Sequence, residues 1–248
     1  MKSRMLQLEY FHSLRALPGA WIILRVDGRS FSRLTEARFE KPFDGRFHDL
    51  MVQVSTLLLT ELHGVVVLTQ SDEASILLPL ASNLFDREVE KLVSLSASVA
   101  TAAFSVAHGQ PACFDSRLWM GANSELVIDY FRWRQADAAR SCLNGWAYWT
   151  LRKEGLTKEA ATRALHRTTS AQKRELLSER GIDFDALPAW QRWGTGVYFR
   201  EVVEDAINRK TGERVTAARR RVYVDEGLAH GRDLETLLLG ILGRSRAE

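Results

Sequence analysis

Two short acidic segments that lie far apart in the chain carry the side chains best suited to chemistry. Asp27 follows an apolar run over 20–26, and Asp72 and Glu73 stand in the polar stretch Gln-Ser-Asp-Glu between two further apolar runs. Hard divalent cations such as Mg²⁺ bind carboxylate oxygens and complete their shell with water and substrate phosphates. If both segments reach the same rim of a sheet, Asp27 and Asp72 form a site for magnesium and for phosphoryl chemistry on a nucleotide. Glu73 is an additional candidate ligand.

The segment after the first aspartate has the composition of a phosphate-binding loop. Gly28 allows close approach of the main chain to a ligand, and Arg29, Ser30, Phe31 and Ser32 offer backbone N–H groups that can surround a triphosphate. The chain contains neither GxxxxGK followed by Ser or Thr nor GxGxxG. Asp-Gly and Ser-Asp-Glu are also ordinary turn sequences, so the residues alone leave open both a metal-nucleotide enzyme and two structural turns.

The elements that position these residues follow from hydrophobic periodicity and turn signals. Strands are expected where short apolar runs meet polar turns, and helices where apolar residues recur every three or four positions. In the first half the predicted elements are a buried strand over 20–26, a helix over 46–63, strands over 64–69 and 74–80, and a helix over 85–104. In the second half they are a helix over 124–154, helices capped by Thr157 and Thr169, a hairpin over 196–204 and 213–224, and a helix over 233–242.

These elements predict an α+β fold with a ferredoxin-like antiparallel sheet and helices, plus a helical second region and a C-terminal β-hairpin. The change of texture near residue 130 divides the chain into 1–130 and 131–248, with no linker between them. Residues 132–248 carry a net charge of +6 and residues 81–131 one of −3. Five of the seven tryptophans lie between 132 and 193, where they either stack on bases or pack in a core.

Composition excludes several classes of protein. With 46% apolar and 26% charged residues in 248, the chain is typical of a globular protein that needs no metal or disulfide in order to fold. Cys113 and Cys142 form no metal-binding motif, so we expect reduced thiols that serve in packing. The N-terminal residues lack the apolar stretch of a secretory signal, and the apolar runs are shorter than a membrane span. We therefore expect a cytoplasmic protein without membrane contact.

Seven segments, in order, resemble the tRNA(His) guanylyltransferase family, and more closely its bacterial and archaeal Thg1-like branch of 3′-to-5′ polymerases. The resemblance covers roughly residues 5–200. The segments are RVDGRSFSRL (25–34), Lys41-Pro42, QSDEAS (70–75), the basic helix start over 87–91, WRQAD (133–137), 170–177 and GIDFDALPAW (181–190).

The resemblance implies a polymerase-like palm in 1–130 and a fingers-like region with RNA contacts in 131–248. Asp27 and Asp72 would hold two Mg²⁺ ions with help from the Gly28 carbonyl. Arg29 to Ser32 would surround the triphosphate, and Ser71 would contact the nucleotide. Lys41 would be a further nucleotide-binding residue and a cation for phosphate. Cations for a second phosphate or for RNA are Arg87, Lys91, Arg134 and Lys173. For the last four a solvated or structural role is an equally open interpretation.

The activity implied is nucleotide addition to the 5′ end of tRNA. The 5′ end is first activated with ATP or already carries a triphosphate, and the 3′-OH of an incoming GTP or other NTP then attacks it. The tRNA acceptor end would be the partner, and the protein would form a homotetramer.

Eukaryotic members carry a histidine in the loop after the first aspartate and His-Ile-Asn-Asn-Leu-Tyr-Asn after RQAD. This chain has Ser32 and a segment over 139–145 that contains no histidine. The difference favours template-directed repair of 5′-truncated tRNA over addition of a single G to tRNA(His). A nucleotidyl-cyclase-like enzyme and a non-catalytic RNA-binding module remain further alternatives.

Overall fold

The computed structural model describes residues 4–5, 7–207 and 212–245, and its centre is a six-stranded sheet. The strands lie in the order β4-β1-β3-β2-β5-β6, and every neighbouring pair is antiparallel. Their bounds are β1 (Trp21–Gly28), β2 (Val66–Gln70), β3 (Glu73–Leu77), β4 (Phe114–Gly121), β5 (Thr195–Ile207) and β6 (Arg214–Asp225).

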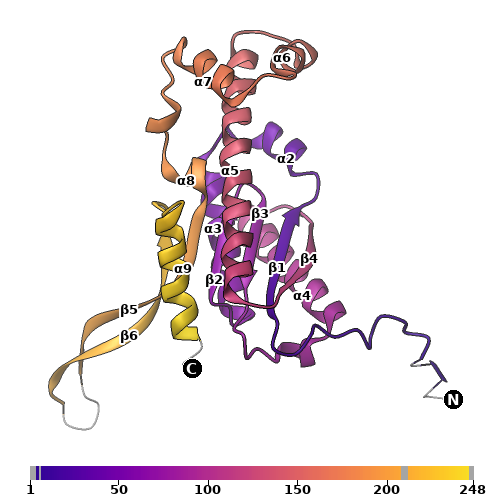
Figure 1. Cartoon of the computed structure of the whole chain (residues 1–248), viewed down its shortest axis with the longest axis vertical. Coiled ribbons are helices and arrows are strands. Elements are labelled where there is room, and N and C mark those ends of the chain that lie inside the picture. Colours follow the sequence, from indigo (N-terminus) through magenta and orange to yellow (C-terminus); the bar gives the residue numbers. More distant parts are fainter. Residues whose placement is uncertain (1–3, 6, 208–211, 246–248) are drawn as a thin grey trace.

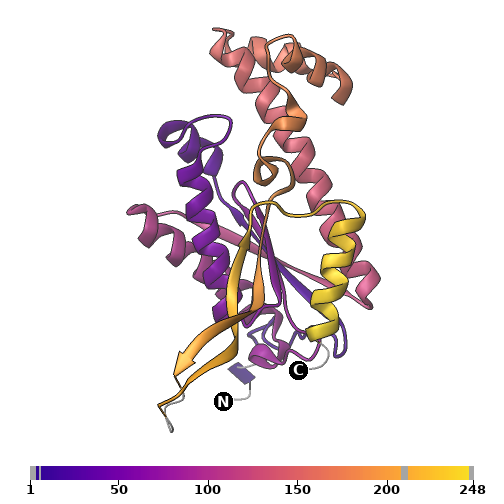
Figure 2. The ribbon, with the colours of Figure 1, turned by 90° about the vertical axis from the view of Figure 1, so that its left-hand side faces the viewer.

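The first four strands and the helices between them form the ferredoxin-like core that the sequence predicts. The helices that connect them are α2 (Phe31–Arg38), α3 (Gly45–Glu61) and α4 (Val89–His108), with a short 3₁₀ turn, η1 (Leu84–Arg87), before α4. Helices α3 and α4 cover one face of the sheet (Figure 2). Alternate residues of β1, such as Ile22 and Leu24, pack on this face because side chains of a strand alternate between its two sides.

The other face of the sheet is covered by α5 (Ser124–Lys153) and α9 (Arg232–Ser245) (Figure 1). Trp21 and Ile23 of β1 pack there against Val127 and Phe131 of α5. Since both faces of the central strands are buried, their sequences are nearly continuous apolar runs. The rim where β1 ends and the β2–β3 turn begins lies between α2 and α5 (Figure 1).

Helix α5 continues beyond the sheet and carries a small distal layer (Figure 1). This layer consists of α6 (Lys158–Leu165), α7 (Ser170–Ser178), η2 (Phe184–Ala186) and α8 (Ala189–Trp193). Thr157 and Thr169 cap α6 and α7 as predicted, and Thr169 forms a full capping box with Gln172. Asn144-Gly145 does not interrupt α5.

Strands β5 and β6 form a long hairpin, and the parts of both strands farthest from β2 project away from the rest of the sheet (Figure 2). Glu204 on one strand accepts two hydrogen bonds from Arg221 on the other, at 2.8 and 2.7 Å. At its base, β5 pairs with β2 over Val66 to Thr69, so the hairpin extends the sheet of the core. The boundary expected at residue 130 falls inside α5, and the division into two domains stays a prediction.

Three sequence expectations differ from the structure. Strand β4 and helix α2 were not predicted, and the helix expected from residue 85 begins only at Val89.

The two cysteines differ in their surroundings. Cys142 is buried, and burial raises the pKa of its thiol to about 12, whereas Cys113 is exposed. Helix α4 is long and apolar enough to cross a membrane by length and composition alone. Its Leu92 and Phe104 side chains nevertheless pack in the core.

Candidate active site

The two acidic segments meet at one rim of the sheet. Asp27 lies opposite Glu73 in the β1–β3 ladder, and the backbone N–H of Gly28 donates to the carbonyl oxygen of Asp72 at 3.0 Å. Ser71, in the turn between β2 and β3, has a positive φ of 53°, and its hydroxyl donates to the Asp72 carboxylate at 3.1 Å. The central strands therefore bring Asp27 and Asp72 together, as the sequence predicts.

Gly28 is required here by close packing. A Cβ at this position would lie 2.5 Å from the ring of Phe31 and 2.9 Å from Cβ of Asp72, closer than real Cβ contacts. Phe31 is itself only 2% exposed, and its ring packs on Phe104 with centroids 4.9 Å apart. Phe31 is therefore a core residue, and only its backbone N–H remains a candidate for contact with a phosphate.

The loop after Gly28 offers fewer free N–H groups than the sequence suggests. The backbone N–H of Arg29 donates to Cys113 at 2.8 Å, so it is not available to a phosphate. Ser30 adopts a left-handed conformation with φ of 63° and starts α2 without a side-chain cap. The first turn of a helix has N–H groups without intrahelical partners, so Phe31 and Ser32 retain backbone donors for an anion.

The electrostatics of the carboxylate pair fit a cation. Burial raises the pKa of Asp72 above its ordinary value, and the charge of Asp27 raises it further, whereas Ser71 and Lys41 oppose the shift. A buried carboxylate beside a second one is stabilised by a divalent ion between them. The described residues contain no group of three His, Cys, Asp or Glu side chains that could bind a metal. Two carboxylates with waters and substrate phosphates nevertheless match what Mg²⁺ usually takes from a protein.

Glu73 does not join this pair. Both of its oxygens accept hydrogen bonds from Arg134, each at 2.7 Å, and Arg25 lies 3.8 Å from one of them. Burial raises the pKa of Glu73, and the two arginines oppose the shift. Arg134 also donates to Asp137 at 2.9 Å. In this structure Glu73 is paired with arginines although it lines the same cavity as Asp27 and Asp72, and its role as a metal ligand stays a prediction. Arg134, expected to bind phosphate or RNA, is paired with two carboxylates.

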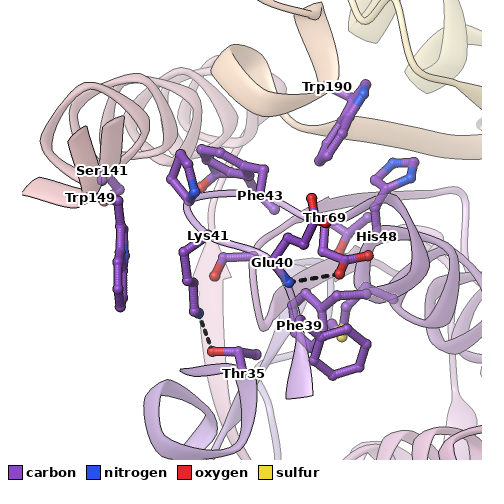
Figure 3. Close-up of a pocket in the computed structure, with 17 residues that line it drawn as sticks. Thr35, Phe39, Glu40, Lys41, Phe43, His48, Thr69, Ser141, Trp149 and Trp190 are labelled. Carbon is purple, nitrogen blue, oxygen red and sulfur yellow. Dashed lines mark hydrogen bonds between the residues drawn. The ribbon is translucent and has the colours of Figure 1, made fainter. Parts of the chain in front are cut away.

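Lys41 reaches the site from the loop after α2. Its amine donates to the hydroxyl of Thr35 at 2.5 Å and lies 5.8 Å from the ring centroid of Trp149 (Figure 3). Burial lowers its pKa, and the charges of Glu36 and Asp72 oppose the shift. This position beside Asp72 agrees with the predicted role of Lys41 at a nucleotide phosphate.

Lys41 lines a cavity of about 190 Å³ with aromatic walls (Figure 3). Phe39, Phe43, Trp149 and Trp190 contribute to the walls, and Thr69, Gln70 and Ser71 form the side toward the β2–β3 turn. The sequence left Trp149 and Trp190 open between stacking and core packing, and it did not single out Phe39 and Phe43. The helical spacing of Ser141, Gly145 and Trp149, four residues apart on α5, could have placed them on one face.

A second cavity of about 170 Å³ adjoins the first and contains the carboxylates. It is lined by Asp27, Ser71, Asp72 and Arg134, among others, and shares Gln70, Ser71 and Ser141 with the aromatic cavity. Gln70 joins its walls, because its amide donates to the carbonyls of Ala138 and Gln191, both at 3.1 Å. The two cavities form one cleft between the rim of the sheet, α5 and α8.

Arg87 and Lys91 lie away from the cleft. The prediction of a phosphate contact is wrong for Arg87 in this structure, and for the exposed Lys91 contact with RNA stays a prediction. Arg87 is only 8% exposed, and its guanidinium donates to the carbonyls of Ala16, Leu17, Ala20 and Ser82. Three of these carbonyls, those of Ala16, Leu17 and Ala20, stand before the start of β1, whereas Asp27 stands near its end, about 20 Å away at the rise of a strand. Lys91 lies one turn along α4, 3.5 Å from Glu88, near the same far end.

Lys173 lies on α7 in the distal layer, and its amine donates to the carbonyl of Thr168 at 3.2 Å. It is therefore outside the cleft. Gln135 and Asp137 of the WRQAD segment serve structural contacts: Gln135 donates to Ala229 at 3.0 Å, and Asp137 binds Arg134 and Arg140. This agrees with the structural interpretation that the sequence left open for the segment.

Comparison with known proteins gives matches along most of the chain. A family model described as tRNAHis guanylyltransferase matches residues 2–121, and one described as Thg1 C terminal domain matches residues 125–227. The tRNA(His) guanylyltransferase of Schizosaccharomyces pombe is 32% identical over 82% of this chain and 82% of its own length. The tRNA(His) guanylyltransferase 2 of Arabidopsis thaliana is 32% identical over 80% of this chain. The chain spans only 39% of that longer relative.

Two solved structures share the fold. The crystal structure of the Saccharomyces cerevisiae tRNA(His) guanylyltransferase has a TM-score of 0.70 and 27% identity, and the alignment covers 77% of this chain and 90% of that one. A bacterial Thg1-like protein in complex with ATP has a TM-score of 0.77 and 22% identity, with 97% and 98% covered. These matches agree with the family models, and the chain belongs to the tRNA(His) guanylyltransferase family of nucleotidyltransferases.

Proposed function

We propose that the protein is a magnesium-dependent 3′-to-5′ nucleotidyltransferase that adds nucleotides to the 5′ end of tRNA. The observation that carries this proposal is the meeting of Asp27 and Asp72 at the rim of the sheet, at a cleft that also contains the half-buried Lys41. The family match and the nucleotide complexes of the bacterial Thg1-like protein, which name ATP and GTP, support it.

The residues of the cleft divide the work of binding. Asp27 and Asp72 would hold two Mg²⁺ ions, which supply electrostatic stabilisation of the phosphate oxygens during transfer. Lys41 binds a phosphate of the nucleotide, and Ser71 contacts the nucleotide from the β2–β3 turn. The aromatic cavity takes the base, since aromatic rings with few polar groups suit a flat heterocycle.

The reaction needs an activated 5′ phosphate, because a monophosphate has a poor leaving group. In the proposed sequence the tRNA 5′ monophosphate first attacks ATP and forms a 5′-adenylate with release of pyrophosphate, unless a 5′-triphosphate is already present. The 3′-OH of an incoming NTP then attacks that phosphorus, and AMP or pyrophosphate leaves. Positioning and charge stabilisation account for most catalysis in such transfers, so the chain needs no strong general base.

We favour repair of 5′-truncated tRNA over addition of one G to tRNA(His). Ser32 stands at the start of α2, and residues 139–145 lie on α5 without a histidine, in contrast to the eukaryotic pattern. A templated enzyme needs no contact with an anticodon, because Watson–Crick pairing with the opposite acceptor strand selects the base. The homotetramer and the cytoplasmic location remain predictions from the resemblance and the composition.

The test is nucleotide addition to a tRNA that lacks its first nucleotide, with all four NTPs and Mg²⁺. We expect extension by the complementary base alone, loss of extension with EDTA, and loss of at least about 100-fold in Asp27→Ala and Asp72→Ala. Full activity in either variant contradicts the metal assignment. Addition of G to intact tRNA(His) without extension of the truncated tRNA supports the G-addition alternative, and a cyclic product from NTP alone supports a cyclase.

A further inference from the structure

Trp133 is an unusual residue of the surface next to the cleft. Of the tryptophans, all of which lie in the described part of the chain, it is the only one in the exposed class, with 54% of its surface accessible. It stands on α5 immediately before Arg134, the residue that holds Glu73 opposite Asp27. A single exposed apolar side chain is common on protein surfaces, so a binding role is inferred from the cationic groups around this ring and from its place beside the carboxylates.

The ring of Trp133 has three neighbours and is still largely exposed. The guanidinium carbons of Arg134 and Arg25 lie 4.5 and 5.7 Å from its ring centroid, and both groups also contact Glu73. Tyr130 packs against it edge to face with centroids 5.7 Å apart. These contacts hold the ring in place, and the exposed 54% of the residue stays accessible to a partner.

A fixed, exposed indole backed by guanidinium groups is a stacking surface for a nucleobase, since every base presents a flat face. Arg117 on the neighbouring strand β4 adds a positive charge: it lies opposite Arg25 in the β1–β4 ladder, and its side chain is 60% exposed. Its ion pair with Asp115, at 3.8 Å, is also on the surface. A phosphate of a nucleic acid can compete for such an exposed pair.

The position of Trp133 points to the RNA rather than to the free nucleotide. The aromatic cavity is lined by β2 and by α3, whereas Trp133 contacts Arg25 of β1 next to the edge strand β4. The two surfaces therefore flank the Asp27–Asp72 pair from opposite sides. The side of Trp133 is an open sheet edge, which suits the end of a large polymer better than a small ligand that needs enclosure.

We propose that Trp133 stacks on the terminal base at the 5′ end of the RNA and so positions the 5′ phosphate over the carboxylate pair. The proposal rests on the function proposed above and adds a binding site for the second substrate. Trp133 is then a positioning residue for the RNA, distinct from the residues that hold the nucleotide.

The test uses a truncated tRNA with the fluorescent base 2-aminopurine at its 5′ terminus, since stacking on an aromatic ring quenches this probe. With the unaltered protein and with Trp133→Phe we expect quenching on binding. With Trp133→Ala we expect a bright terminal probe and RNA affinity about 5- to 100-fold lower, the loss typical of one base–aromatic contact. Tyr10→Ala, which removes an 81% exposed aromatic residue from the N-terminal segment, is the matched control and should quench like the unaltered protein.

Two further measurements separate the outcomes. Binding of a fluorescent ATP analogue should be the same in Trp133→Ala and in the unaltered protein, and thermal unfolding of both Trp133 variants checks that they fold. Unchanged quenching and affinity in Trp133→Ala overturn the proposal, as does loss of ATP-analogue binding with normal RNA quenching. Because binding is measured without turnover, a protein that quenches the probe through Trp133 but adds no nucleotide would refute the proposed function and leave this inference standing.

Discussion

Asp72 suits a protein with a bound cation, and it lowers the stability of the protein without one. Its carboxylate is buried and lies close enough to Asp27 for the charge to raise its pKa. Ionising such a group costs free energy in the folded protein that it does not cost in the unfolded chain. In the absence of a cation, Asp72 therefore lowers the stability of the fold at neutral pH.

Asp72→Asn should raise the stability of the metal-free protein. Because the folded pKa of Asp72 lies above its unfolded value, the folded state binds more protons, and stability falls as pH rises through the folded pKa. In EDTA we expect a gain of about 0.5–2 kcal/mol at neutral pH that disappears in acid, where Asp72 is neutral in both states. Urea unfolding at a series of pH values measures it. In Mg²⁺ only the unaltered protein should gain stability, and a less stable variant in EDTA would contradict the assignment.

Arg87 shows why an arginine that looks functional in the sequence can be structural. The apolar stripe from residue 85 predicted a helix that exposes Arg87, but Phe85 and Asp86 adopt positive φ angles of 52° and 50°. This kink ends the stripe and turns Arg87 inward to four backbone carbonyls. A periodic pattern does not reveal such a kink, because the residues involved are not glycines.

Arg87→Ala should destabilise the protein without affecting the chemistry. It leaves buried carbonyl groups without a donor, and we expect a loss of about 2–4 kcal/mol in the free energy of unfolding. Lys91→Ala, at a nearby exposed position, is the control and should change stability by less than about 0.5 kcal/mol. Activity per folded molecule, assayed below both melting temperatures, should stay normal. A fall in the activity of fully folded Arg87→Ala would support a role of Arg87 in substrate binding.

Among the strands of the core, the three next to the acidic residues were the easiest to predict. Strand β4, which pairs with β1, was the hardest. Strands β1, β2 and β3 are apolar runs that end at polar turns, and the expected bounds lie within a few residues of those observed. Strand β4, with the sequence FDSRLWMG, contains no Val, Ile or Thr, and its burial does not alternate regularly. Its pairing with β1 decides its structure, and local propensity does not.

The same limit applies to the cleft. The turn signals predicted that the two carboxylates meet, and Lys41 and Ser71 were expectations from the family resemblance. The ion pair that engages Glu73 joins β3 to α5, and the aromatic cavity joins the loop after α2 to α5 and α8. Contacts between such distant segments depend on tertiary packing, which periodicity does not encode.

Gly28→Ala tests the packing of the first strand against the turn. The added methyl group would lie within 3 Å of Phe31 and of Asp72, so one of them must move. A displacement of about 1 Å at a reacting group can lower a rate by about 100-fold, and we expect a loss of that order in nucleotide addition. Gly45→Ala, where no atom lies within 4 Å of the new Cβ, is the matched control and should be nearly fully active. Equal activity in the two variants would show that Asp72 tolerates the shift.

At the scale of the whole molecule, the sheet and the distal layer are joined by α5. Arg134 on this helix contacts the carboxylate of Glu73, which lies opposite Asp27. The C-terminal end of α5 adjoins α6 and α7. Residues 132–248, which include α5, the distal layer and the hairpin, carry a net charge of +6, and this agrees with a polyanionic partner.

Helix α5 has a geometric consequence for any long substrate. Between Arg134 and Lys153 it runs without a break, and at 1.5 Å per residue this distance is about 28 Å. A nucleic acid that contacts both ends of α5 must span this fixed length. The length of the RNA stem then decides whether its 5′ terminus reaches the carboxylates. Inserting one turn of helix after Gly145 would lengthen α5 and change the length of truncated RNA that the protein accepts.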